Sequence, residues 1–137
     1  MMEQRTDEWY SARIGKITAS RIGGINAKPK KGNALNSTLV ELLSERLTGL
    51  PTDTKTNADM QWGIDCEPLA RQAYELATFQ TVVETGLIDH PTIPMSGASP
   101  DGLVGKYGLI EIKCPKSPTH TNTLLTGQVP SEYMPQI

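Results

Sequence analysis

Residues 99–113 read SPDGLVGKYGLIEIK and are the most informative segment of the chain. Its central GKYG segment separates two short apolar runs and predicts a β-hairpin. Folding the hairpin about Lys106 places Asp101 opposite Glu111, and Lys113 projects from the same strand face as Glu111. Two facing carboxylates repel each other unless a cation lies between them. The stretch therefore predicts a site for a hard divalent cation with oxygen ligands.

Two interpretations of this hairpin are open from the residues alone. An alternation of Ile with Glu and Lys is typical of any half-exposed strand, on which Glu and Lys pair routinely. In the second interpretation the Ile112 carbonyl joins the two carboxylates as a metal ligand, and Lys113 holds or deprotonates an attacking water. Pro100-Asp101 is followed at hairpin distance by Glu111-x-Lys113, and this order resembles the signature of the PD-(D/E)xK nuclease superfamily. The resemblance favours the metal-site interpretation.

Charge is distributed unevenly along the chain. The 137 residues carry 13 basic and 15 acidic side chains. Residues 9–40 contain Arg and Lys but no Asp or Glu, whereas most of the acids follow residue 50. A basic surface attracts phosphate and an acidic one suits divalent cations, although a solvated lysine loop explains the basic part equally well.

Composition argues against a membrane or secreted protein. No apolar run approaches the roughly 18 residues of a membrane span, and the polar N-terminus lacks the apolar core of a signal peptide. The two cysteines, Cys66 and Cys114, form no CxxC pair. We interpret them as reduced cytosolic thiols that serve in packing.

Helix signals dominate the first half of the chain. Thr6 is the predicted N-cap of a helix that runs to about Arg13. A capping box from Thr38 to Glu41 predicts a second helix that ends at Gly49. The face of this second helix that we expect to be buried carries Leu39, Leu42, Leu43 and Leu47. A helical region over 58–77 follows, with a kink or two abutting helices at Pro68.

Strand signals dominate the second half. We expect strands near 81–89, 95–99, 101–104 and 109–114, then helical turns at 121–125 and a last helix from Pro130. The order predicts one α/β or α+β domain over residues 1–137, mainly helical over 1–78 and with the catalytic sheet over 79–137. We expect Trp9 and Trp62 to be core anchors rather than wedges that stack on bases.

Five separated blocks resemble one branch of that superfamily, the phage lambda exonuclease or YqaJ-type viral recombinase family. In chain order the blocks are Arg5-x-x-x-Trp9-x-x-x-Arg13-x-Gly15-x-Ile17-Thr18-Ala19-Ser20, Trp62-Gly63-x-x-x-Glu67-x-x-Ala70, Gly97-Ala98-Ser99-Pro100-Asp101-Gly102, Leu109-Ile110-Glu111-Ile112-Lys113-Cys114-Pro115 and Tyr133-Met134-Pro135-Gln136. They extend over most of the chain, so they are far more specific than the short signature alone.

The resemblance implies a restriction-endonuclease-like fold with a central mixed sheet flanked by helices. It also implies a cytoplasmic Mg²⁺-dependent 5′→3′ exonuclease, of a bacterial host or phage-infected cell, that acts on the ends of linear double-stranded DNA. Such enzymes hydrolyse the strand with a 5′ phosphate and leave a 3′ single strand for an annealing protein in recombination. Mn²⁺ is an expected substitute for Mg²⁺, with two ions per site during catalysis.

The resemblance also assigns roles to individual residues. It implies that Asp101, Glu111 and the Ile112 carbonyl are metal ligands and that Lys113 is the catalytic lysine. The remaining implied site residues are Glu67 and Gln136 in the catalytic set, and Arg13, Ser20 and Ser99 in a pocket for the 5′ phosphate. A surface arginine, an N-cap serine and an ordinary helical ion pair of Glu67 with Arg71 are the alternatives.

The chain stops one residue after Gln136, where the family fold continues. We therefore expect a truncated protein with an incomplete sheet, which argues against the family's ring-shaped homotrimer. Two alternatives to the exonuclease stay open. One is an endonuclease of the same superfamily, and the other is a catalytically silent remnant that binds DNA ends or a recombination partner.

Overall fold

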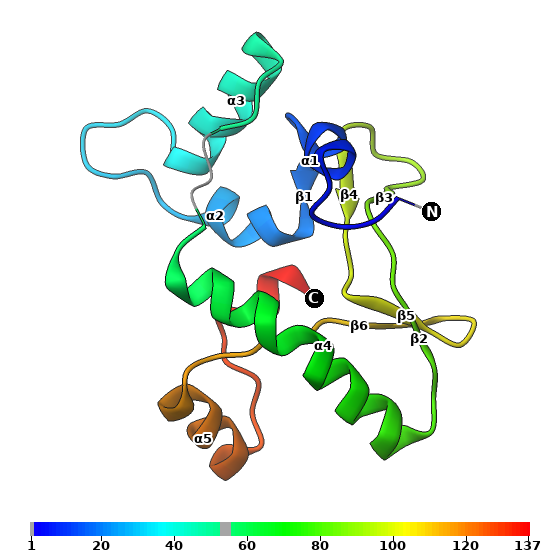
Figure 1. Ribbon diagram of the computed structural model, residues 1–137. Coiled ribbons are helices and arrows are strands. Elements are labelled where there is room, and N and C mark those ends of the chain that lie inside the picture. Colours follow the sequence, from blue (N-terminus) through cyan, green and yellow to red (C-terminus); the bar gives the residue numbers. More distant parts are fainter. Residues whose placement is uncertain (1, 53–55) are drawn as a thin grey trace. The chain divides into compact units, whose positions relative to one another are not determined.

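A computed structural model describes residues 2–52 and 56–137 of the protein (Figure 1). The chain forms two compact units. The first comprises Met1–Thr54, Thr85–Ser99 and Ser131–Ile137, and the second comprises Lys55–Glu84 and Pro100–Pro130. Both units combine helices with a three-stranded sheet, which confirms the predicted α+β class.

The first unit begins with helix α1 (Asp7–Arg13), as predicted. Thr6 is its N-cap, and the Thr6 hydroxyl accepts a hydrogen bond from the Trp9 backbone N–H at 3.2 Å. Gly15 then turns the chain with a φ of +67°, a conformation that glycine adopts without steric cost. The 3₁₀ turn η1 (Ala19–Arg21) and helix α2 (Ile22–Asn26) follow.

Helix α3 (Ser37–Thr48) begins two residues earlier than predicted. Its N-cap is Asn36 rather than Thr38, because the Asn36 Oδ1 accepts the Leu39 N–H at 2.9 Å while its amide nitrogen holds two carbonyls of the preceding loop. Gly49 ends the helix with a φ of +69°, as predicted. Leu42 is buried, but Leu43 and Leu47 are exposed, so the expected four-leucine core face is wrong.

The sheet of the first unit has the order β1-β4-β3. Strand β1 (Ile17–Thr18) pairs in parallel with β4 (Ser96–Ala98), and β3 (Ile88–Asp89) pairs antiparallel to β4. A Cβ at Gly97 would lie 2.6 Å from the Ile88 carbonyl oxygen, so the close pairing of β3 with β4 requires glycine there.

The chain's last described segment belongs to the first unit. The 3₁₀ turn η2 (Met134–Gln136) contacts η1 and α2. The predicted last helix from Pro130 is therefore wrong: turns and a 3₁₀ segment replace it, because Pro135 lacks the N–H that an α-helix would use at that position.

The second unit begins with helix α4 (Ala58–Thr78), which is capped by Asn57 and ends at Phe79 in the left-handed region. Pro68 lies inside this single helix, so the alternative of two abutting helices is wrong. Helix α5 (Ser117–Thr126) confirms the predicted helical turns at 121–125 and is one turn longer. Gly127 ends α5 with a φ of +64°.

The sheet of the second unit is antiparallel, with the order β2-β5-β6. Strands β5 (Gly102–Val104) and β6 (Gly108–Ile110) pair Gly102 with Ile110 and Val104 with Gly108, so the hairpin folds about Lys106 as predicted. Strand β2 (Val82–Val83) pairs with β5. The expected strand over 109–114 is shorter than predicted and ends at Ile110.

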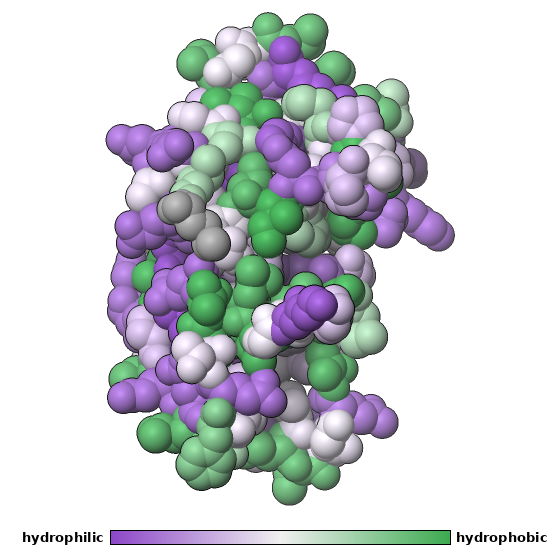
Figure 2. Space-filling view, turned by 90° about the vertical axis from the view of Figure 1, so that its right-hand side faces the viewer, coloured by the Kyte–Doolittle hydropathy of each residue, from purple (hydrophilic) through white to green (hydrophobic). Residues whose placement is uncertain are grey.

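Little apolar surface is fully buried in the described residues. The buried hydrophobic side chains are Leu42, Val82 and Val104, whereas Phe79 is 94% exposed. Trp62 is 55% exposed, so its predicted role as a core anchor is wrong, and Trp9 is half-buried. On the face drawn in Figure 2, hydrophobic side chains are interspersed with hydrophilic ones. Within the described ranges, every helix is too short or too polar to cross a membrane.

Candidate active site

An acidic cluster lies at the base of the β5–β6 hairpin in the second unit. The Asp101 backbone N–H donates to the Ile110 carbonyl at 3.1 Å, and the Asp101 Oδ2 accepts the Ile112 N–H at 2.6 Å. The side chain of Asp101 thus takes the place of the next backbone acceptor in the ladder, just where β6 ends. This contact holds the carboxylate beside the segment that carries Glu111 and Lys113.

Burial raises the pKa of Asp101 to about 6. The Ile112 N–H acts in the opposite direction, while the negative charges of Glu111 and Glu67 raise the pKa further and Lys113 lowers it. Three carboxylates therefore lie near enough to interact electrostatically. The predicted grouping of Glu67, Asp101, Glu111 and Lys113 is present within this one unit.

The other charged residues of the acidic cluster, Glu67, Glu111 and Lys113, each form an ion pair. The Lys113 Nζ lies 2.7 Å from the Glu111 Oε1, with both side chains partly exposed. Glu67, on α4, lies 2.7 Å from Arg71 one turn later, which is the ordinary helical pair that the sequence left as an alternative. Arg71 also pairs with Glu84. Arg71 therefore fixes the Glu67 carboxylate, whose charge also acts on Asp101.

The donor set at this cluster suits a hard divalent cation. Asp101 and Glu111 supply carboxylate oxygens, and no described residue donates a hydrogen bond to the carbonyl of Ile112. A cation between the carboxylates would offset the burial and the repulsion that together raise the pKa of Asp101. Within residues 2–52 and 56–137 no three His, Cys, Asp or Glu side chains are grouped as ready metal ligands, so the backbone carbonyl would have to complete the set.

The two cysteines flank this cluster in the sequence, one beside Glu67 and one beside Lys113. Both Cys66 and Cys114 are half-buried free thiols, consistent with the predicted packing role. Burial raises the pKa of Cys114, and the charges of Cys66, Glu67 and Asp101 raise it further. Such a thiol stays protonated at neutral pH.

A second polar cluster lies in the first unit and is centred on Arg13, at the end of α1. Arg13 Nη1 donates to Ser99 Oγ at 3.1 Å, across 86 residues of sequence. Arg13 Nη2 donates to Ser20 Oγ at 3.2 Å and to Thr18 Oγ1 at 3.5 Å. The three residues predicted to bind a 5′ phosphate are thus brought together, with Thr18 as an added member that sequence reasoning missed.

The partners of Arg13 are neutral hydroxyl groups, and among the described residues no carboxylate forms an ion pair with it. Burial lowers the pKa of Arg13, and the charge of Arg21 lowers it further. A half-buried guanidinium in this setting favours an added anion. Its neighbour Arg21 differs, because a carboxylate neutralises it.

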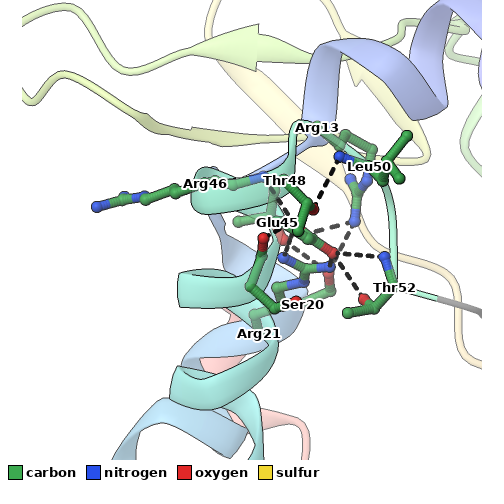
Figure 3. Close-up of polar contacts among 11 residues, drawn as sticks. Arg13, Ser20, Arg21, Glu45, Arg46, Thr48, Leu50 and Thr52 are labelled. Carbon is green, nitrogen blue, oxygen red and sulfur yellow. Dashed lines mark hydrogen bonds and ion pairs between the residues drawn. The ribbon is translucent and has the colours of Figure 1, made fainter.

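That carboxylate is Glu45 of α3, which sequence reasoning also missed. Glu45 is 2% exposed and binds both terminal nitrogens of Arg21, at 2.8 and 2.7 Å (Figure 3). It also accepts the Gly15 N–H at 2.7 Å and the Thr52 hydroxyl at 2.7 Å. The hydrogen bond from Arg21 is the main reason why the pKa of Glu45 falls to about 2. The only sequence signal was an acid at a helix position that faces the core.

Gln136 lies in η2 and belongs to the first unit, whereas the other four predicted catalytic residues belong to the second. The 5′-phosphate residues Arg13, Ser20 and Ser99 all belong to the first unit. The role of Gln136 stays a prediction.

The amino-acid sequence matches a known protein family. The YqaJ-like viral recombinase domain matches residues 8–137. The chain belongs to that family. Comparison with curated protein sequences finds no match.

Solved structures of an alkaline exonuclease from Laribacter hongkongensis share the fold. One is 47% identical with a TM-score of 0.82, and the other, a complex with dAMP, is 50% identical with a TM-score of 0.84. Both matches cover 96% of this chain but 65% of the exonuclease, so the chain spans about two thirds of that protein's length. The similarity confirms the predicted PD-(D/E)xK fold.

Proposed function

We propose that the chain is a divalent-metal-dependent exonuclease that digests the 5′-phosphorylated strand of linear double-stranded DNA. The observation that carries this proposal is the grouping of Asp101, Glu111, Glu67 and Lys113 at the base of one hairpin. The family and the similarity to an alkaline exonuclease support the same reaction class.

The proposed metal site uses Asp101, Glu111 and the Ile112 carbonyl. A bound Mg²⁺, or Mn²⁺ in its place, would polarise the phosphodiester and stabilise the leaving oxygen. Lys113 lies 2.7 Å from Glu111, so its Nζ is placed to hold a water beside the same carboxylate. After the ammonium has lost a proton, the neutral amine would accept the proton of that water. Glu67 adds negative charge from α4, and Gln136 is proposed to help position the water or the scissile phosphate.

End selection is assigned to the Arg13 cluster. A terminal 5′ phosphate is an acceptor-rich dianion, and Arg13 with the Ser20 and Ser99 hydroxyls offers charged and neutral donors from one surface. A 5′-hydroxyl end lacks these acceptors. The cluster is therefore proposed to distinguish phosphorylated from unphosphorylated ends.

The single-stranded DNA that the exonuclease would leave indicates which kind of protein we propose as its partner. Removal of one strand from its 5′ end leaves a 3′ single strand, and a protein that anneals single strands is the expected consumer in recombination. The ring-shaped homotrimer around DNA that the family resemblance implies is proposed for a protein with the complete family fold.

The direct test uses linear duplex DNA with a 5′ phosphate on one strand only, with and without Mg²⁺, and a closed circular duplex as control. We expect Mg²⁺-dependent loss of the phosphorylated strand with the circle intact. Cutting of the circle would favour the endonuclease. End binding by folded protein with no turnover in Mg²⁺ or Mn²⁺ would favour the binding remnant.

A further inference from the structure

We propose that Trp9 is a positioning residue of the 5′-phosphate pocket: its indole N–H fixes Ser99 as a hydrogen-bond donor toward the phosphate. This inference rests on the proposed function, in which Ser99 and Arg13 bind the terminal phosphate. Trp9 is separated from Ser99 by 90 residues, yet its Nε1 donates to the Ser99 Oγ at 3.0 Å.

The Ser99 hydroxyl has a fixed number of hydrogen-bonding sites. A hydroxyl oxygen has two lone pairs and one hydrogen. At Ser99 both lone pairs are used, one by Trp9 Nε1 at 3.0 Å and one by Arg13 Nη1 at 3.1 Å. Ser99 has no acceptor for its own hydrogen among the described residues. Its hydroxyl is therefore left with a single hydrogen-bonding capacity, which is to donate.

A donor-only hydroxyl discriminates between ligands. A phosphate dianion presents acceptor oxygens, so it satisfies the Ser99 hydrogen directly. Without the indole N–H, one lone pair of Ser99 would be open, and the hydroxyl would rotate among donor and acceptor arrangements. Binding the anion would then restrict the rotation of the hydroxyl, and this loss of entropy would weaken the affinity.

Trp9 also contacts the charged member of the pocket. The Arg13 guanidinium carbon lies 4.2 Å from the centroid of the Trp9 ring, within range of a cation–π interaction. One indole therefore orients Ser99 through its N–H and supports Arg13 through its face. Both contacts lie within the first unit. The same side chain fixes two of the three groups that the proposed function assigns to the phosphate.

The experiment separates the N–H from the ring. Trp9→Phe keeps an aromatic face for Arg13 and removes the donor to Ser99. Binding of a duplex oligonucleotide with a 5′ phosphate, and of the same duplex with a 5′ hydroxyl, is measured in EDTA so that no cleavage occurs. We expect the preference of Trp9→Phe for the phosphorylated end to fall about fivefold relative to the unsubstituted chain.

A double-mutant cycle tests whether Trp9 acts through Ser99. In a Ser99→Ala background the indole has no hydroxyl to orient, so Trp9→Phe is expected to change the preference by less than about twofold. Trp62→Phe is the matched control, since Trp62 is the chain's second tryptophan and lies in the other unit. It is expected to leave the preference unchanged.

A second replacement covers the case in which Trp9→Phe folds poorly. Incorporation of 3-benzothienylalanine at position 9 keeps the bicyclic shape and replaces the N–H by sulfur. The same loss of preference in this variant would support the proposal. The proposal would be overturned if either folded variant kept the unsubstituted chain's preference for the phosphorylated end. It would also be overturned if Trp9→Phe changed that preference equally in the Ser99 and Ser99→Ala backgrounds. If the unsubstituted chain cleaves DNA in Mg²⁺ but binds both ends equally, the pocket and this inference both fail while the exonuclease stands.

Discussion

The Asp101 carboxylate accepts the Ile112 backbone N–H at 2.6 Å, just beyond Gly102 and Ile110, the last paired residues of the β5–β6 hairpin. The contact gives Asp101 two roles. It closes the hairpin where the strand ladder ends, and it fixes one carboxylate oxygen while the second stays available to a cation. These roles are separable, because an amide oxygen can accept the same N–H.

Asp101→Asn is therefore expected to fold and to lose activity. Asparagine keeps an acceptor for Ile112 but not the negative charge that a divalent cation requires, so Mg²⁺-dependent cleavage should fall by about 100-fold or more. Asp89→Asn, which removes a carboxylate from β3 in the first unit, is the matched control. Thermal unfolding checks the fold. Near-normal cleavage by Asp101→Asn would exclude this carboxylate as a ligand.

Glu111→Ala and Lys113→Ala are each expected to abolish cleavage with little effect on stability. The two side chains pair at 2.7 Å in a partly exposed position, and such pairs contribute about 1 kcal/mol or less to the free energy of unfolding. Lys106→Ala, at the exposed hairpin turn, is the control for loss of a lysine. Turnover at the unsubstituted rate in either variant would refute the site.

Arg13→Ala is expected to weaken use of 5′-phosphorylated ends more than 5′-hydroxyl ends. Arg13 donates to Ser99 and Ser20, and a lost charge-assisted hydrogen bond corresponds to a rise in KM of about 10-fold or more on the phosphorylated substrate. Arg13→Lys keeps the charge without the planar fork, and an intermediate effect is expected. Lys28→Ala, in the exposed loop after α2, controls for net charge. An equal loss on both ends would count against a phosphate pocket.

Stability of the first unit is expected to fall in acid because of Glu45. Its folded-state pKa is about 2, below the ordinary value of 4.5, so the stabilisation is complete above the ordinary value and is lost as the pH falls toward 2. The chain with Trp62→Phe, whose remaining tryptophan is Trp9, allows unfolding of this unit to be followed by fluorescence between pH 6 and 2.

Glu45→Gln should flatten that pH dependence and lower the stability at pH 7 by on the order of 3 kcal/mol, because Arg21 loses its carboxylate. Glu41→Gln, one turn earlier on α3 and exposed, is the matched control. An unchanged acid profile in Glu45→Gln would assign the acid sensitivity to other carboxylates.

Much of the local structure could be predicted from the chain. Thr6, Gly49 and the GKYG turn each act through their own backbone geometry, and the structure has them as expected. The wrong predictions concern places where a contact with a residue outside the local segment changed the structure that the local sequence favoured. The N-cap of α3 is Asn36 instead of the predicted Thr38, because the Asn36 amide nitrogen also donates to the Ile25 and Ala27 carbonyls. The expected strand through residue 114 ends at Ile110, because the Asp101 side chain takes the next N–H.

The hairpin register, the superfamily signature and the identity of the acidic and lysine residues could all be read from the amino-acid sequence, since these depend on spacing along a few neighbouring residues. The family resemblance implied one pocket for Arg13, Ser20 and Ser99. It took the three-dimensional structure to show that Trp9 and Thr18 contact this pocket, and that Arg21 is neutralised by Glu45 while Arg13 is not. The physical reason is that a hydrogen bond or an ion pair is set by the distance between atoms, and spacing along the chain carries no such information once strands from distant segments pair.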